Sequence, residues 1–270
     1  MAFVLLAVTS ARARPRDLGV DISHHQGESG ISQATWNQIA AEGSKFAFIK
    51  ATEGLSGADD PAMASNLARA TSAGILNGVY HYAHAENRPT PAGAVLEANH
   101  FLAYAGAAIG PGHLRPVIEV EGSNSRLDAI GLTNWVIAFI NRVVEVRGPS
   151  AEPIIYTNAI FTDNKFDPRI ANYDLWIYEP NPAYDPFTGN PDPSSLGHFP
   201  NWSFWQYNVT GNLAGISPLD LDVVHSEYKP LASYLIVPEP SSIALALAAI
   251  LACSVPLAHW VEDRPRRKRG

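Results

Sequence analysis

The chain has 270 residues, of which 46% are hydrophobic, so it can bury one large core of the size found in single-domain barrels of about 200–250 residues. A net charge of -7 argues against a nucleic-acid partner, which normally requires a basic face. Cys253 is the only cysteine, which excludes a disulfide framework and a cysteine-ligated zinc site within one chain.

The first residues have the pattern of a targeting segment. An apolar run from Met1 to Val8 is followed by Ala11-Arg12-Ala13, which has the small-x-small form of a secretory cleavage site. We therefore expect residues 1–16 to be a signal peptide and the protein to be exported. The run lacks the basic residues that usually precede it, as in a truncated signal peptide, and an irregular N-terminal extension is the alternative.

From residue 17 to residue 228, short apolar runs alternate with helical patterns, as in βα units wound around a parallel sheet. Eight runs are expected to be strands, which is the number that closes an α/β barrel. They are Leu18–Ser23, Phe46–Thr52, Leu76–Tyr82, Pro116–Glu121, Pro153–Tyr156, Leu175–Tyr178, Ser203–Tyr207 and Leu219–Val224.

Helical patterns fill the early connections but not the last ones. They cover Gln33–Glu42, Pro61–Ala73, Pro91–Ala105, Thr133–Arg147 and, more weakly, Phe161–Tyr173. Thr133 is a candidate N-cap and Gly148-Pro149 a candidate stop for the fourth helix. Residues 179–200 are rich in proline, glycine and asparagine and predict a long loop. The expected fold is therefore a single-domain, irregular α/β barrel of the TIM type, whose last three strands lack full helical crossovers.

Residues 229–237 are expected to be a linker, and residues 238–270 combine three elements of a sorting tail. Pro238-Glu239-Pro240 precedes an apolar run from Ile243 to Trp260, long enough for a transmembrane helix, and a basic cluster follows from Arg264 to Arg269. This order resembles the PEP-CTERM sorting signal, which implies transient membrane anchoring and removal of the tail by an exosortase-type membrane protease. A buried core helix is the alternative, but it would place the arginines beside the core.

Carboxylates interrupt strands that should otherwise be buried, and they stand near the strand ends where barrel enzymes carry their active sites. They are Asp21, Glu119, Glu121, Asp220 and Asp222. Glu119 and Glu121 are two residues apart on one strand, so their side chains point to the same side, about 6.6–6.8 Å apart along it. Repulsion and burial should raise the pKa of at least one of them, as a general acid in glycosidic cleavage requires. Two glutamates facing solvent at the barrel rim are the alternative.

Aromatic and amide side chains cluster near the same strand ends. Aromatic faces suit the C–H faces of sugar rings, and tyrosine hydroxyls and glutamine amides can orient sugar hydroxyls. Each such residue, taken singly, is more often part of the core, but together with the carboxylates they indicate a glycan site. The candidates are Tyr80, Tyr82, Trp176, Tyr178, Trp205, Gln206 and Tyr207.

Two other kinds of site are disfavoured. His24 and His25 could be metal ligands, but neighbouring side chains point apart and no third ligand at a suitable spacing is evident, so no metal is expected. Ser23 and His25 could suggest a serine hydrolase, but no nucleophile elbow accompanies them. His81 is expected to be a core histidine or to line the site.

Seven motifs in order resemble glycoside hydrolase family 25, the N-acetylmuramidase lysozymes, over Gly19 to Val224. No single motif is specific, but their order is. The motifs are Gly19–Gly27 (GVDISHHQG), Phe46–Gly54 (FAFIKATEG), Gly78–Tyr82 (GVYHY), Glu119–Glu121 (EVE), Ile155–Asn158 (IYTN), Leu175–Ile177 (LWI), and Trp205–Tyr207 (WQY) followed by Asp220–Asp222 (DLD).

The resemblance implies an irregular (β/α)5(β)3 barrel that hydrolyses the β-1,4 bond between N-acetylmuramic acid and N-acetylglucosamine of peptidoglycan, with retention and with no metal or cofactor. By position, Glu121 corresponds to the catalytic acid, Asp21 and Asp220 to carboxylates of the site floor, and Glu119 to the carboxylate that stabilises the N-acetyl group or the intermediate. Substrate would be bound by five of the candidates already named and by a further tyrosine, Tyr156. The six residues are Tyr80, Tyr82, Tyr156, Trp176, Tyr178 and Gln206. The protein is expected to act as a monomer.

The sequence departs from the family pattern at two positions. Glu119 stands where aspartate is usual, and one added methylene moves the carboxylate by more than an ångström, a displacement that can cost about a hundredfold in rate. Asp222 stands where many relatives have asparagine. Two rival hypotheses follow: a non-catalytic glycan-binding surface protein on the same barrel, and a glycosidase for chitin or another amino-sugar polymer.

Overall fold

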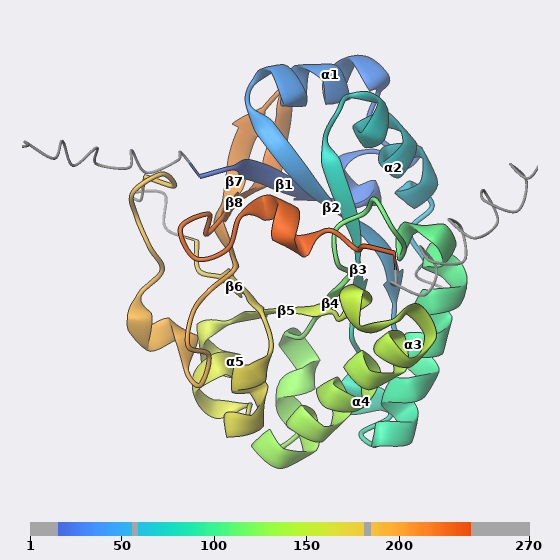
Figure 1. The fold of residues 1–270 in the computed structure, drawn as a ribbon, viewed down its shortest axis with the longest axis vertical. Helices are drawn as coiled ribbons and strands as arrows, with labels where there is room; N and C mark the ends of the chain where they lie inside the picture. Colours follow the sequence, from blue (N-terminus) through green and yellow to red (C-terminus); the bar gives the residue numbers. More distant parts are fainter. Residues whose placement is uncertain (1–15, 56–58, 181–184, 239–270) are drawn as a thin grey trace, which may run out of the picture. The chain divides into compact units, whose positions relative to one another are not determined.

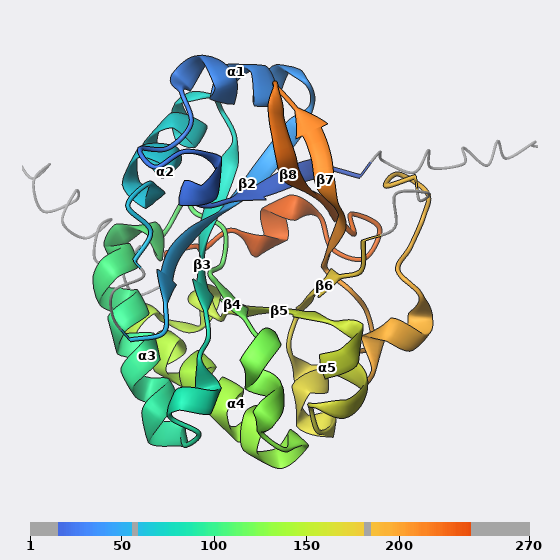
Figure 2. The ribbon, with the colours of Figure 1, turned by 180° about the vertical axis from the view of Figure 1, so that it is seen from behind.

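The computed structural model describes residues 16–55, 59–180 and 185–238. The predicted signal peptide, apart from Arg16, and the predicted sorting tail, apart from Pro238, lie outside the described residues. The structure confirms the predicted fold, which is an α/β barrel closed by eight strands in the order β1 to β8 (Figures 1 and 2).

The eight strands follow the predicted order along the chain. They are β1 (Leu18–Ile22), β2 (Ser44–Glu53), β3 (Leu76–Tyr82), β4 (Val117–Glu119), β5 (Ile154–Asn158), β6 (Leu175–Tyr178), β7 (Phe204–Leu213) and β8 (Ile216–Val224). Neighbours from β1 to β7 pair in parallel, whereas β8 is antiparallel to both β7 and β1.

The direction of β8 is a feature that the pattern of βα units around a parallel sheet did not predict. Only Ala214 and Gly215, both with positive φ (53° and 79°), separate β7 from β8, and a two-residue turn can join strands only in antiparallel fashion. The hairpin extends both strands beyond the predicted ranges, to Leu213 and from Ile216. Figure 2 shows it beside α1, and the backbone N–H of Ala214 donates to Glu42 after that helix (2.9 Å).

Five helices lie outside the barrel, α1 and α2 on one side and α3 to α5 on the other (Figure 1). They are α1 (Gln33–Ala41), α2 (Met63–Ser72), α3 (Pro91–Ala105), α4 (Ala129–Arg147) and α5 (Ala159–Asn164). Among the described helices, α4 alone has the length and hydropathy to span a membrane. Its apolar face, including Trp135 and Phe139, is buried among the core residues of the barrel.

Two helix boundaries differ from the predictions. Asp128, not Thr133, caps α4 by accepting from the backbone N–H of Gly131 (2.6 Å), while buried Thr133 accepts from Asp167 N–H (2.9 Å). The predicted fifth helix is broken into α5 and a 3-10 turn from Pro168 to Asn172, because the residue before a proline disfavours helical backbone.

The interior of the barrel is filled mainly by aromatic rings. Phe48 lies 4.7 Å from Trp176 and 5.2 Å from Phe204, measured between ring centroids. Tyr234, which is fully buried, packs under Phe204 at 4.7 Å. A second layer between the sheet and the helices contains Trp36, Phe101, Trp135, Phe139 and Ile177, among others. The interior is therefore a packed core and not an open channel.

Residues 229–237, expected to be a linker, are packed on the barrel. They contain a 3-10 turn from Leu231 to Tyr234, and Ile236 is 3% exposed. The backbone of Arg115 donates to Tyr234 O (2.7 Å), and that of Ile236 donates to His113 O (2.8 Å), just before β4 begins. The segment thus closes the amino-terminal end of the barrel, where the orange-red ribbon crosses it in Figure 1.

Candidate active site

A cavity of about 400 Å³ opens at the opposite end, at the carboxyl ends of the parallel strands. It brings together the ten residues to which the family resemblance assigned a role, whereas the further candidates Trp205, Tyr207 and Asp222 do not line it. The ten are the carboxylates Asp21, Glu119, Glu121 and Asp220, with Tyr80, Tyr82, Tyr156, Trp176, Tyr178 and Gln206. The structure thus shows that the ten residues share one pocket, while the roles assigned to them stay predictions.

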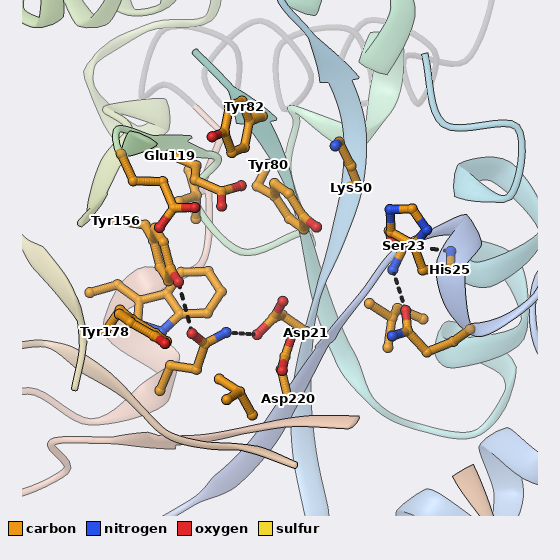
Figure 3. A pocket seen from close by; sticks show the side chains of 17 residues that line it. Asp21, Ser23, His25, Lys50, Tyr80, Tyr82, Glu119, Tyr156, Tyr178 and Asp220 are labelled. Atoms are coloured by element: carbon orange, nitrogen blue, oxygen red, sulfur yellow. Dashed lines mark hydrogen bonds between the residues drawn. The ribbon is translucent and has the colours of Figure 1, made fainter. Parts of the chain in front are cut away.

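The floor of the cavity is a hydrogen-bonded chain across three strands. The Tyr156 hydroxyl on β5 donates to Gln206 Oε1 on β7 (2.8 Å), and Gln206 Nε2 donates to Asp21 Oδ2 on β1 (2.6 Å; Figure 3). Asp21 and Gln206 are 7% and 3% exposed. The chain fixes the orientation of the Asp21 carboxylate, because each donor is itself held by its neighbour.

Asp220 reaches the floor differently from what the strand pattern predicted. Since β8 is antiparallel, Asp220 lies directly opposite Asp21 in the β1–β8 register, near the amino end of the buried part of its strand. Figure 3 shows the two carboxylates next to each other. Burial and the Asp220 charge raise the pKa of Asp21 to about 8, and burial raises the pKa of Asp220 to about 6.

Glu119 and Glu121 line one wall, as the two-residue spacing predicted. Strand β4 ends at Glu119, but Glu121 keeps an extended backbone (φ −154°, ψ −169°), so the alternation continues and Val120 between them is fully buried on the other side. Burial raises the pKa of both glutamates, and for Glu119 the charges of Glu121 and Asp21 raise it further. The pair therefore releases its protons one after the other, as an acid and its carboxylate partner require.

Lys50 on β2 is a site residue that sequence reasoning left without a role. It is 8% exposed, lines the cavity, and its charge opposes the rise in the pKa of Glu119. Its Nζ donates to Glu53 Oε2 (2.6 Å), and Glu53 Oε1 is 2.9 Å from His84 Nε2. The sequence does carry a signal for it, because Lys50 is the one charged residue in the apolar strand run from Phe46 to Ala51.

Aromatic side chains form the remaining walls. The rings of Tyr156 and Trp176 meet edge to face at 4.8 Å, and Tyr178 lies 6.5 Å from Tyr156. Burial raises the pKa of Tyr80 and Tyr156, so both hydroxyls remain donors at neutral pH. Trp176 is 2% exposed and belongs largely to the core. Trp205 is also buried in the core, outside the cavity.

The histidines take structural positions or lie at the rim. His81 is fully buried between Thr52 Oγ1 (2.8 Å from Nδ1) and Glu97 Oε2 (3.0 Å from Nε2), which makes it a core histidine. His24 Nδ1 lies 3.0 Å from Asp60 Oδ2, whereas His25 lines the cavity. Within the described ranges, no three His, Cys, Asp or Glu side chains converge as metal ligands would.

Paired carboxylates with unequal environments, set in an aromatic pocket at the end of an α/β barrel, define a glycoside-cleaving type of site. Comparison with known proteins agrees with this class. Residues 20–216 match the sequence model of glycosyl hydrolases family 25, and the chain belongs to this family.

Relatives with known names extend the comparison. Lysozyme M1 of Streptomyces globisporus is 29% identical over 208 residues, which cover 74% of this chain but only 64% of the relative. The N,O-diacetylmuramidase of Chalaropsis sp is 34% identical over 149 residues, covering 52% of this chain and 65% of that protein. The crystal structure of the bacterial lysozyme from Streptomyces coelicolor has a TM-score of 0.64 at 26% identity, covering 81% of this chain and 96% of that one.

Proposed function

We propose that the protein is a lysozyme-type muramidase that cleaves the β-1,4 bond between N-acetylmuramic acid and N-acetylglucosamine in peptidoglycan. The observation that carries the proposal is the pair Glu119 and Glu121 on one wall of the cavity, both with raised pKa values, facing Asp21 and Asp220 on the floor. The names of the relatives, a lysozyme and a diacetylmuramidase, support the same substrate.

In this mechanism, protonated Glu121 donates its proton to the glycosidic oxygen as the bond from the anomeric carbon breaks. The carboxyl groups of Glu119, Asp21 and Asp220 hold the N-acetyl group, and those that are ionised stabilise the positive charge that develops on the sugar. Retention requires an intermediate, formed by the N-acetyl oxygen of the substrate or by a carboxylate of the pocket. Water then hydrolyses the intermediate, and Glu121 accepts the proton of that water.

Delivery to the cell surface is part of the proposal. The N-terminal segment would export the protein, and the tail from Pro238 onward would hold it in the membrane until an exosortase-type protease removes it. Action as a monomer is supported by the cavity, because all ten predicted site residues come from one chain.

The test is release of reducing ends from purified peptidoglycan by the full chain, with products analysed for muramic acid at the new end. Glu121→Gln should lower the rate by about 10²–10⁴-fold, the usual contribution of a general acid, without lowering the melting temperature. Glu145→Gln on the exposed face of α4 is the matched control and should keep full activity.

Three other outcomes would redirect the assignment. Undiminished release by Glu121→Gln would overturn its role as the acid. Release from chitooligosaccharides but not from peptidoglycan would change the substrate class. Binding of peptidoglycan by the folded wild-type chain, without release of reducing ends, would identify a glycan-binding protein in which Glu119 has abolished turnover.

A further inference from the structure

Asp222 is a buried carboxyl group directly beneath the floor of the cavity. On β8 it points to the same side as Asp220 but lies one pleat deeper, where it pairs with Gly19 of β1 and Gln206 of β7. It is 0% exposed and does not line the cavity. The mechanism above gives it no role, yet a buried carboxyl group without a function would be costly to retain.

The surroundings of Asp222 supply one donor and one further acid. Trp176 Nε1 donates to Asp222 Oδ1 (2.9 Å). Asp222 Oδ2 is buried and has no hydrogen-bond partner among the described residues. In the β1–β8 register Asp222 pairs with Gly19, two residues before Asp21, and a hydrogen bond between the two acids is one cause that raises the pKa of Asp222 and lowers that of Asp21. Two carboxylates cannot form a hydrogen bond unless one of them carries a proton.

The titratable groups that face Asp222 are two other acids, which favour its neutral form, and two tyrosine hydroxyls, which are uncharged at neutral pH. Asp21 on β1 and Asp220 on β8 are acids, and the hydroxyls of Tyr156 on β5 and Tyr207 on β7 have their pKa values raised in part by Asp222 itself. Burial, followed by the charges of Asp21 and Asp220, raises the pKa of Asp222 well above its usual range.

Of the two acids, Asp222 is the one placed to hold the proton. Asp21 already accepts the short hydrogen bond from Gln206 Nε2 (2.6 Å), which stabilises its ionised form, and it is 7% exposed at the cavity floor. Asp222 has no exposure, so its ionisation would be opposed by burial more strongly.

We propose that Asp222 is a positioning residue, which as a neutral carboxylic acid donates a hydrogen bond from Oδ2 to Asp21 and keeps Asp21 ionised and oriented for the reaction. Asp21 is then held from two sides, by Gln206 and by Asp222, while Trp176 holds Asp222 through its other oxygen. The link to catalysis rests on the proposed function, whereas the protonation of Asp222 does not.

Two substitutions separate this role from a merely structural one. Asp222→Asn has nearly the same shape and can reproduce both bonds, because its oxygen accepts from Trp176 and its amide donates to Asp21 at every pH. Asp222→Leu has the same number of side-chain heavy atoms and the same branching but can make neither bond. We expect kcat/KM for peptidoglycan to stay within about threefold of wild type in the Asn variant and to fall by about a hundredfold in the Leu variant, the cost of a misplaced reacting group.

Two measurements on the full chain need no substrate. Infrared difference spectra at neutral pH should show a protonated-carboxyl C=O band in wild type that Asp222→Asn lacks. Because the folded pKa of Asp222 lies above the unfolded one, its stabilising contribution is complete below the usual value of 3.8 and is lost as pH rises through the folded pKa. The melting temperature of wild type should therefore fall relative to that of Asp222→Asn as pH rises above about 4.

The outcomes distinguish the two proposals. No band difference, or melting curves that keep a constant offset with pH, would show that Asp222 is ionised and would overturn the inference even if the protein is a muramidase. If wild type releases no reducing ends but the band and the pH-dependent offset are found, the protonated Asp222 stands and the proposed function fails. Loss of activity in Asp222→Asn as severe as in Asp222→Leu would overturn the positioning role.

Discussion

The distribution of protons over the glutamate pair depends on charges outside it, of which Lys50 is the one cation among the described residues. Glu119 and Glu121 compete for a proton, and the proposed reaction needs that proton on Glu121. Lys50, buried in the lining of the same cavity, opposes the rise in the pKa of Glu119 and is not among the causes acting on Glu121. Lys50 therefore biases the proton toward the acid that faces the substrate.

Replacing this lysine tests the balance. In Lys50→Met the opposing charge is gone, so the pKa of Glu119 rises and the acidic limb of the pH profile of kcat/KM should move to higher pH, with a several-fold loss of activity at mildly acidic pH. Lys45→Met, on the exposed side of the same strand, is the control. An acidic limb that stays in place would show that Glu119 need not be ionised.

Individual site residues were predictable where a strand pattern and a chemical type coincide. Asp21, Glu119 and Glu121 interrupt apolar runs, and the alternation along β4 indicated that the two glutamates share a side. Lys50 and Asp222 could not be given roles in this way, because their effect depends on neighbours from other strands: Glu119 for Lys50, and Asp21 for Asp222. Such cross-strand pairs follow from the closed register and not from local sequence.

The boundaries of helices and strands also depend in part on tertiary contacts that local sequence does not predict. The eight strands and five helices could be placed from periodicity, but the start of α4 could not, since Asp128 and Thr133 are both good N-caps. Tertiary packing decides which of the two caps the helix. Thr133 accepts a hydrogen bond from the backbone N–H of Asp167, and Asp128 therefore begins the helix. The direction of β8 likewise depends on the two-residue turn at Ala214 and Gly215.

The cap of α4 can be measured directly. Asp128→Ala removes the acceptor for Gly131 N–H and should lower the free energy of unfolding by about 1 kcal/mol, as for other N-caps, whereas Asp128→Asn keeps an acceptor and should be close to neutral. Urea unfolding of the two variants compares them on the same scale. Equal stability of both variants and wild type would mean that another residue starts the helix.

At the scale of the whole molecule, both ends of the described chain are fastened to the barrel. Arg16 is 6% exposed, donates to Glu227 (3.0 Å) and to Asn190 Oδ1 (3.1 Å), and lies 5.0 Å from the Trp202 ring centre. Near the other end, Lys229 Nζ donates to Asp174 Oδ1 (2.9 Å), and Asp174 Oδ2 is paired with Arg115. Cleavage after residue 16, as the predicted signal peptide implies, would remove the contacts of Arg16, and cleavage before Lys229 would remove its bond to Asp174.

The position of the C-terminal boundary gives the last prediction. Motif patterns placed the end of the catalytic domain at Tyr228, but Leu231, Tyr234 and Ile236 are 5%, 0% and 3% exposed against the barrel. Burial of such side chains stabilises by roughly 1.5–3 kcal/mol each, so losing all three would remove an amount comparable to the whole stability of a typical domain. A chain ending at Tyr228 should therefore be unfolded or melt at a far lower temperature than one ending at Val237, and circular dichroism compares their melting temperatures.

Tyr234→Ala in the longer chain gives a graded test if the shorter chain is insoluble, with an expected loss of about 3–5 kcal/mol in the free energy of unfolding. Equal melting temperatures for the two chains, or an unchanged free energy of unfolding in Tyr234→Ala, would show that residues 229–237 are a linker as first predicted.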